Sequence, residues 1–330
     1  MFSSRNMYAI ILAGDEDMQL APLARALSIA SVPRQYALIA GEGSLLQQTV
    51  AFYASLLPPE QIVVVVATKW KELARAQLRK WRDTCVVARP RNRGSAVDVM
   101  LGLRQIMACD PHATVVMAPA DAYVPHARAL VAPLAAAETA LSKVPVILAG
   151  VPMNHAVLGD RLVVPGPPLT GRVRSVRRLV EHLPPEQVQR FKAKGALWDT
   201  SIYLARAATL WPLVAQQLPA EVAAGAGLGS DASPPRSSVQ AAYRRTRVGQ
   251  LATRRWQEID GFGVIAVRGS GWSAWTTPQQ VMDSLRDPHE LEQLLSRIYQ
   301  HQHGIDRAQL RRRFRHEAMQ RPASTVCIAR

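Results

Sequence analysis

The residues that follow Gly14 have the outline of a phosphate-binding loop but the wrong charge for one. An apolar run at residues 8–13 leads into this glycine, and a helix is expected to begin near Pro22. A strand, a loop and a helix in this order aim backbone N–H groups at phosphate oxygens. Residues 15–17, however, are all acidic, and three carboxylates there should repel a triphosphate. The sequence therefore predicts the strand–loop–helix structure of a phosphate site more clearly than it predicts that phosphate binds there.

The elements expected around this loop alternate between strands and helices. Residues 63–66 are four consecutive valines, a run typical of a strand buried on both faces of a sheet. The alternation predicts a largely parallel sheet with helices on both faces, and ligands in such sheets bind at the carboxyl ends of the strands. We expect strands at 8–13, 61–67, 85–88, 114–119 and 144–151, and helices at 19–30, 44–57, 69–81, 93–107 and 124–141.

The second half of the chain changes character. Residues 219–240 are rich in Ala, Gly, Ser and Pro and predict a mobile loop. We expect one α/β domain over residues 1–290 and a basic helical extension over 291–330, with a helix at 306–321. Leu310 and Phe314 are spaced to dock that helix on the body. Further strands are expected at 161–165, 171–181, 198–204 and 261–267, and helices at 186–194 and 207–218 and from 277 onward.

The composition of the chain favours a globular protein with a basic surface. The chain has 330 residues with 48% hydrophobic content, which supports a sizeable core. Lys and Arg number 40 against 25 Asp and Glu, a net charge of +15 that attracts polyanions. Aromatic residues make up only 6%, which argues against a single-stranded nucleic acid binder. The basic C-terminal helix has two interpretations, a solvated face or a surface for a polyanion or partner protein.

Nothing in the sequence predicts export or a membrane span. Residues 1–6 are too short and polar for a secretory signal, and no apolar run is long enough to cross a bilayer. The cysteines, Cys85, Cys109 and Cys327, show neither paired nor metal-ligand spacing, so we expect reduced thiols. A cytoplasmic location follows as the expectation.

Six short segments, taken in order, resemble the sugar-1-phosphate nucleotidyltransferases, and most of all the mannose-1-phosphate guanylyltransferases. The resemblance covers residues 8–285. It implies an α/β, Rossmann-like nucleotidyltransferase fold, with a mostly parallel mixed sheet and helices on both faces. Each segment is a weak match alone, but six in the right order make a strong signal for the fold. The segments are 44–50 (SLLQQTV), 93–96 (RGSA), 118–121 (APAD), 179–182 (LVEH), 197–203 (LWDTSIY) and 272–278 (WSAWTTP).

The resemblance also implies a reaction. In this family a sugar phosphate attacks the α-phosphate of a nucleoside triphosphate and releases pyrophosphate, helped by backbone donors, cations and a divalent metal held by aspartates. For this chain it implies GTP and mannose 1-phosphate as substrates, GDP-mannose as product, and Mg²⁺ as cofactor if the protein is active. Asp121 takes the place of a metal-binding and catalytic aspartate, with Arg34 and Glu181 as further catalytic candidates. The implied nucleotide contacts are Leu12, Ala13, Gly14, Gln35, Arg93, Gly94 and Ser95, and the implied sugar contacts are Glu181, His182, Trp198 and Asp199.

The chain departs from the family pattern at the reaction centre. The family loop GGxGTRLxPL reads GDEDMQLAPL here, so two glycines and an arginine are gone. Ala274 stands where the second metal aspartate is expected, and alanine cannot coordinate Mg²⁺. Arg34 and His182 each stand where the family has a lysine. Losing one such group typically costs roughly 10²–10³-fold in rate, so these changes argue against ordinary guanylyltransferase activity.

Three hypotheses stay open at this point. The first is an active nucleotidyltransferase with an altered site, for which Asp121 is essential. The second is a non-catalytic paralogue that binds a nucleotide sugar or regulates a partner, either an active paralogue or a second copy of itself. The third is a polyanion binder, which predicts salt-sensitive association without sequence preference.

Overall fold

The computed structural model describes most of the chain. The expected helix 19–30, loop 219–240 and helix 306–321 lie outside the described residues, apart from Leu20 and Leu23. Within the described part, no helix is both long and apolar enough to cross a membrane. The described residues are 6–14, 32–41, 43–89, 94–153, 161–181, 184–216, 261–285 and 288–303, with Leu20, Leu23, Asn92 and Ile259.

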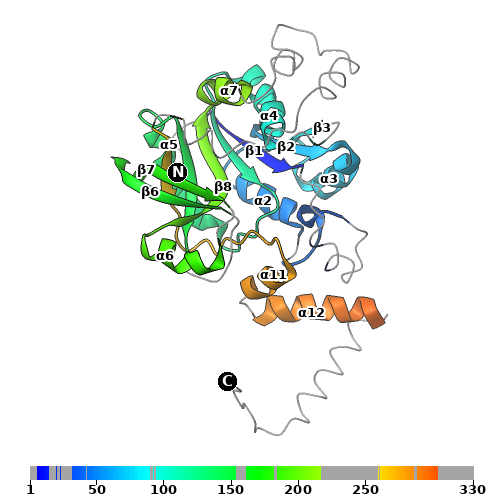
Figure 1. The fold of residues 1–330 in the computed structure, drawn as a ribbon. Coiled ribbons are helices and arrows are strands. Elements are labelled where there is room, and N and C mark those ends of the chain that lie inside the picture. Colours follow the sequence, from blue (N-terminus) through cyan, green and yellow to red (C-terminus); the bar gives the residue numbers. More distant parts are fainter. Residues whose placement is uncertain are drawn as a thin grey trace.

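A nine-stranded mixed sheet forms the centre of the described structure (Figure 1). The strand order is β3-β2-β1-β4-β8-β5-β9-β7-β6, and β6 also pairs with β8. The strands are β1 (Met7–Ala13), β2 (Ile62–Ala67), β3 (Cys85–Arg89), β4 (Thr114–Pro119), β5 (Val146–Pro152), β6 (Arg161–Thr170), β7 (Val173–Glu181), β8 (Leu197–Arg206) and β9 (Gly263–Ala266).

The sheet is mixed, as expected, but its parallel part is smaller than the sequence predicts. Strands β3, β2, β1 and β4 are parallel neighbours. Strand β8 then runs antiparallel to both β4 and β5, and the β6–β7 and β7–β9 pairs are antiparallel too. Strands β5 and β9 form the remaining parallel pair. The carboxyl ends of β1 and β4 therefore lie side by side, where the sequence analysis places Gly14 and Asp121.

The valine run explains why both faces of the sheet are covered. Successive side chains of a strand point to opposite faces. Val64 and Val66 accordingly belong to one hydrophobic cluster, whereas Val63 and Val65 belong to the other. All four are 3% exposed or less, so β2 is buried on both sides, as its sequence predicts.

Helices cover the two faces. The first cluster includes residues of α2 and α5, and the second includes residues of α4 and α7. Helices α11 and α12 lie together beyond the α2 side of the sheet (Figure 1). Leu294 of α12 is fully buried against the first cluster. The helices are α2 (Leu45–Ala54), α3 (Lys71–Gln77), α4 (Ser95–Cys109), α5 (Val131–Ala140), α6 (Val188–Ala193), α7 (Ala207–Ala215), α11 (Pro278–Ser284) and α12 (Pro288–His303).

Several boundaries differ from the sequence-based ones for physical reasons. The helix expected at 124–141 begins only at Ala127, because residues 123 and 126 form backbone hydrogen bonds with 273 and 270. The strand expected at 161–165 continues to Thr170 despite its prolines. It lies at the edge of the sheet, with register shifts against β7, and edge strands tolerate residues that lack an N–H donor. The helix expected at 69–81 is broken into α3 and flanking 3-10 turns.

Candidate functional site

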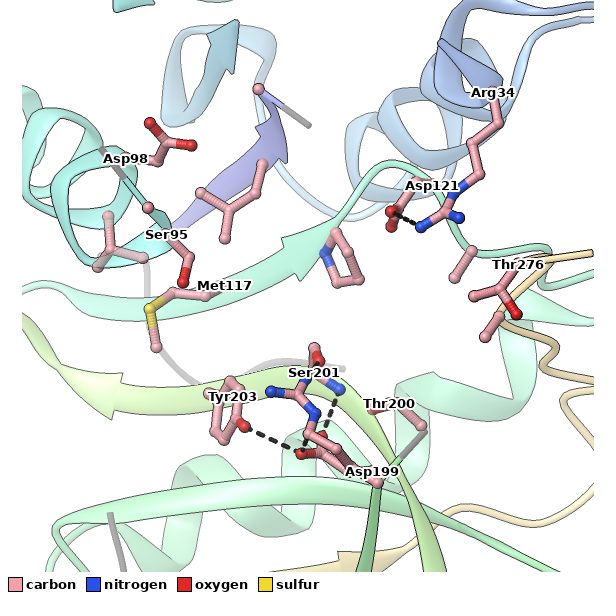
Figure 2. Close-up of a pocket in the computed structure, with 18 of the residues that line it drawn as sticks. Arg34, Ser95, Asp98, Met117, Asp121, Asp199, Thr200, Ser201, Tyr203 and Thr276 are labelled. Carbon is pink, nitrogen blue, oxygen red and sulfur yellow. Dashed lines mark hydrogen bonds and ion pairs between the residues drawn. The ribbon is translucent and has the colours of Figure 1, made fainter. Parts of the chain in front are cut away.

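A pocket of about 530 Å³ opens at the carboxyl ends of β1 and β4 (Figure 2). Its volume lies within the roughly 300–1,000 Å³ that is usual for ligand sites. One side is formed by β1, the end of β3 and the start of α4, and the other by β6, β7, β8 and the 272–276 segment. The two sides carry different polar groups, and we call them the α4 side and the β8 side.

The α4 side is built around a glycine that starts the helix. Gly94 is the N-cap of α4 and has φ +91°, a left-handed conformation that glycine adopts without strain. The side chain of Asn92 fixes this turn, because its Oδ1 accepts a hydrogen bond from Gly94 N at 3.0 Å. As a glycine, the N-cap residue has no side chain with which to cap the helix. The N-terminus of α4 lies at the wall of the pocket, where a partial positive charge favours an anion.

A buried ion pair lies in the same wall. Arg89, the last residue of β3, places Nη1 3.1 Å from Oδ2 of Asp98 on α4, and its Nη1 also donates to Asn92 Oδ1 at 2.9 Å. The two charged side chains are only 2% and 7% exposed. The Nε and Nη2 groups of Arg89 find no hydrogen-bond partner among the described residues. The pair packs tightly under Gly14, where a Cβ would lie 2.7 Å from the Asp98 carboxylate and 2.9 Å from Arg89 Nε.

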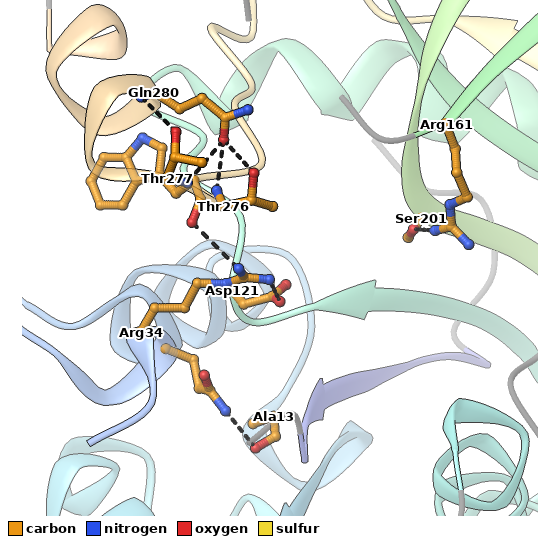
Figure 3. A network of polar contacts seen from close by, with 10 residues as sticks. Ala13, Arg34, Asp121, Arg161, Ser201, Thr276, Thr277 and Gln280 are labelled. Carbon is orange, nitrogen blue, oxygen red and sulfur yellow. Dashed lines mark hydrogen bonds and ion pairs between the residues drawn. The ribbon is translucent and has the colours of Figure 1, made fainter. Parts of the chain in front are cut away.

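A second ion pair lies at the end of β4. Arg34, in the 3-10 turn Arg34–Tyr36, donates from Nη2 to Oδ2 of Asp121 (Figure 3). Its Nη1 also donates to the carbonyl oxygen of Trp275 at 3.4 Å. The side chains of Arg34 and Asp121 are 9% and 18% exposed, so water screens this pair little.

The 273–276 segment is held beside Asp121 by contacts that the sequence spacing does not reveal. Tyr123 and Ser273 exchange two backbone hydrogen bonds of 2.9 Å, and the rings of Tyr123 and Trp275 stack with centroids 4.4 Å apart. Trp275 is fully buried with φ +47°, an unusual conformation for a non-glycine residue. These contacts bring Ala274 to the wall of the same pocket as Asp121.

The β8 side holds a connected set of polar side chains. Asp199 accepts hydrogen bonds from Ser201 N at 2.7 Å and Tyr203 Oη at 3.3 Å, and Arg161 Nε lies 3.5 Å from its Oδ2. Arg161 also donates to Ser201 Oγ (Figure 3). Burial raises the pKa of Tyr203 well above its ordinary value, and the charge of Asp199 adds to this effect, so its hydroxyl stays protonated and can donate.

The structure brings most of the predicted site residues to one pocket. Glu181, at the end of β7, and Asp199 line the β8 side. Trp198 does not line the pocket, because it is buried in the first hydrophobic cluster. Arg93 and His182 lie outside the described residues, as do the acidic residues 15–17. The pocket is also lined by Leu12, Gly14, Arg34, Gly94, Ser95 and Asp121.

Ala13 and Gln35, two further residues predicted to contact the nucleotide, lie next to the pocket but do not line it. Gln35 Nε2 donates to the Ala13 carbonyl at 3.1 Å, and Tyr36 Oη donates to the same oxygen at 2.9 Å. Both Ala13 and Gln35 are buried. They fix the end of β1, on which the start of the loop depends.

The sequence analysis missed Arg89, Asp98, Arg161 and Tyr203, which all line the pocket. Asp98 carries a usable signal, because it interrupts the apolar run Ala96-Val97-Asp98-Val99-Met100 near the start of a helix. A charged residue in such a run is buried only when it is paired. Its partner Arg89 ends an apolar strand but cannot be chosen from the sequence among the neighbouring arginines.

At the end of β4 the described residues offer a divalent metal one carboxylate, that of Asp121. Mg²⁺ needs near-octahedral oxygen ligands, usually including one or two carboxylates. Here one oxygen of Asp121 accepts from Arg34, and Ala274 offers no ligand. Among the described residues, no three His, Cys, Asp or Glu side chains lie together where they could hold a metal ion.

The fold matches those of known structures. The mannose-1-phosphate geranyltransferase of Thermus thermophilus is similar with a TM-score of 0.70 and 22% identity, over 86% of this chain and 81% of that one. The chain therefore shares the mixed α/β, Rossmann-like fold of this structure. The mannose-6-phosphate isomerase of Helicobacter pylori is similar with a TM-score of 0.60 and 14% identity, over 81% of this chain and 99% of that one.

A further structure with this fold is the inositol-1-phosphate CTP transferase of T. maritima, with a TM-score of 0.50 and 12% identity, over 90% of this chain and 98% of that one. No protein-family model and no curated protein sequence matches the chain. The fold expected from the six segments is therefore confirmed, and it is shared at low sequence identity.

Proposed function

We propose that this chain is a sugar-phosphate nucleotidyltransferase-like protein that binds a nucleoside diphosphate sugar. GDP-mannose is the nearest candidate ligand. We further propose that the chain does not catalyse the conversion of GTP and mannose 1-phosphate to GDP-mannose and pyrophosphate at an ordinary rate. The observation that carries this proposal is the composition of the pocket, in which polar groups line both sides while Asp121 is present and Ala274 stands at the second metal position.

The α4 side supports binding of the nucleotide part. The N-terminus of α4 favours an anion, and its N-cap Gly94 has no side chain to keep a ligand from the backbone. The β8 side supports binding of the sugar. Carboxylates and hydroxyls held in a network before the ligand arrives suit a polyhydroxylated ligand, because little ordering remains to be done on binding.

The reaction centre between the two sides supports the second part of the proposal. Transfer to an α-phosphate needs positive charge that is preorganised where negative charge develops. The carboxylate of Asp121 already accepts from Arg34, and Ala274 adds no metal ligand. Of the two positions at which the family holds its metal, one carboxylate is left, and that one is engaged.

Two measurements on the purified chain test the proposal. Calorimetry with GDP-mannose should show saturable binding. An assay of pyrophosphate release with GTP, mannose 1-phosphate and Mg²⁺ should show no turnover above the background without enzyme. Turnover that Asp121→Asn abolishes would establish an active nucleotidyltransferase working through one metal aspartate, and would overturn the non-catalytic part. Absence of GDP-mannose binding would overturn the binding part.

A further inference from the structure

The Arg34–Asp121 ion pair belongs to the wall of the pocket at the end of β4. Figure 3 shows Arg34 extending from its turn towards Asp121, with Thr276, Thr277 and Gln280 beside the pair. The pair is mostly buried, since the side chains are 9% and 18% exposed. Arg34 lines the same pocket as Ser95 of α4 and Asp199 of β8, so a diphosphate bound in this pocket can come within reach of the guanidinium.

Several contacts hold Arg34 in place from the side away from the pocket. Its Nη1 donates to the carbonyl of Trp275, and Trp275 is fixed by stacking on Tyr123 and by a 2.6 Å hydrogen bond from its Nε1 to Ser284 Oγ. The following turn is fixed by the capping box of Thr277 and Gln280 at the start of α11. The guanidinium is therefore positioned by the fold as well as by Asp121.

From these contacts, and resting on the proposed function, we propose that Arg34 provides the positive charge for a diphosphate without any metal ion. Phosphate oxygens and a carboxylate accept the same fork of N–H donors, and arginine binds either in a bidentate manner. Asp121 is then a competitor of the ligand for Arg34 rather than a ligand of a metal. Binding of the diphosphate exchanges one anionic partner of Arg34 for another.

This exchange explains how a mostly buried cation can serve as a binding group. A buried charge left without a partner is costly, so a free guanidinium here would destabilise the empty protein. Asp121 pairs with Arg34 while the pocket is empty, and the diphosphate does so when the pocket is filled. Asp121 is the more exposed member of the pair, so its carboxylate can turn towards water when the ligand arrives.

The proposal predicts opposite effects for the two residues. Asp121→Asn should tighten GDP-mannose binding by about tenfold, because it removes the competing charge. Arg34→Gln should weaken binding by about ten- to hundredfold, because it removes charge-assisted hydrogen bonds. In the double variant Asp121→Asn should have almost no effect, because the competition acts through Arg34. A metal ligand would behave in the opposite way at residue 121.

The experiment is calorimetry with GDP-mannose on the full chain, in EDTA and in Mg²⁺, for the wild type, both single variants and the double variant. Arg34→Lys is included in case Arg34→Gln fails to fold, because lysine keeps the positive charge. We expect wild-type affinities that agree within about twofold with and without Mg²⁺. An affinity that needs Mg²⁺, or that falls in Asp121→Asn, overturns the inference while the proposed binding function stands. No binding by the wild type in either buffer overturns the proposed function and the inference together.

Discussion

Replacement of Asp98 by asparagine is expected to be among the most destabilising conservative changes in this chain. The carboxylate of Asp98 is the anionic partner of Arg89, at 3.1 Å, and both side chains are almost completely buried. The substitution removes the carboxylate charge but leaves the hydrogen bond from Arg89 to Asn92 Oδ1. The Nε and Nη2 groups of Arg89 already have no hydrogen-bond partner among the described residues. Leaving one buried charge uncompensated typically costs about 3–5 kcal/mol.

The same reasoning predicts that removing both charges is much less harmful than removing one. The double replacement Arg89→Met with Asp98→Val exchanges the pair for apolar side chains, and such exchanges of buried pairs are often neutral. We therefore expect the double variant to recover most of the stability that Asp98→Asn loses. This recovery separates the cost of an unpaired charge from the cost of disturbed packing.

Urea unfolding followed by circular dichroism measures the change in the unfolding free energy. The matched control is Glu72→Gln, which breaks an ion pair with Arg75; the Arg75 and Glu72 side chains are 52% and 82% exposed. That change should stay within about 0.5 kcal/mol, because exposed pairs contribute little. A loss below about 1 kcal/mol for Asp98→Asn, or a double variant as unstable as the single one, would refute the reasoning.

Two further predictions concern a glycine and a buried tyrosine. Gly14→Ala should cost about 1–3 kcal/mol in urea unfolding and weaken GDP-mannose binding, because its Cβ would lie 2.7 Å from the Asp98 carboxylate. Gly43→Ala, whose Cβ would meet only the Gln47 side chain at 3.2 Å, should cost less. The Tyr53 hydroxyl is buried with no partner among the described residues, so Tyr53→Phe should stabilise the fold by up to about 1 kcal/mol. Burial raises the pKa of Tyr53 above its ordinary 10.0, so the unfolded chain loses this proton first and stability should fall as pH rises above 10.0. Urea unfolding between about pH 8 and pH 11 should show a shallower fall for Tyr53→Phe, and equal slopes would contradict the assignment.

Patterns that depend on local sequence predicted the fold well. The four valines of β2 identified a strand buried on both faces, and Ser44, which caps α2, marks a helix start with its capping box to Gln47. The elements that were misplaced are those that long-range contacts decide. The start of the helix after β4 is delayed by pairing with residues 270 and 273, about 150 positions away, which no local pattern can reveal.

In the candidate site, too, single residues could be predicted from local sequence, whereas contacts between distant residues could not. Asp121, Gly94 and Ala274 could be assigned roles from the six segments because each of the three belongs to one of them. The Arg34–Asp121 pair joins residues 87 positions apart, so each partner could be predicted from the sequence but the contact between them could not. Arg89 and Asp98 escaped notice because neither belongs to a matching segment, although their pairing determines the shape of the wall under Gly14.

The support of the Ala13 carbonyl has a consequence for how this chain can change over evolutionary time. Two side chains from outside the loop, Gln35 and Tyr36, hold that oxygen, and Gln77 Nε2 in turn donates to the Tyr36 carbonyl at 2.9 Å. The end of β1 is therefore anchored by residues that lie outside 15–19. Such an anchor lets the residues after Gly14 be exchanged without loss of the surrounding architecture. A glycine-rich loop grafted at this point would likewise meet a strand end that is already in position.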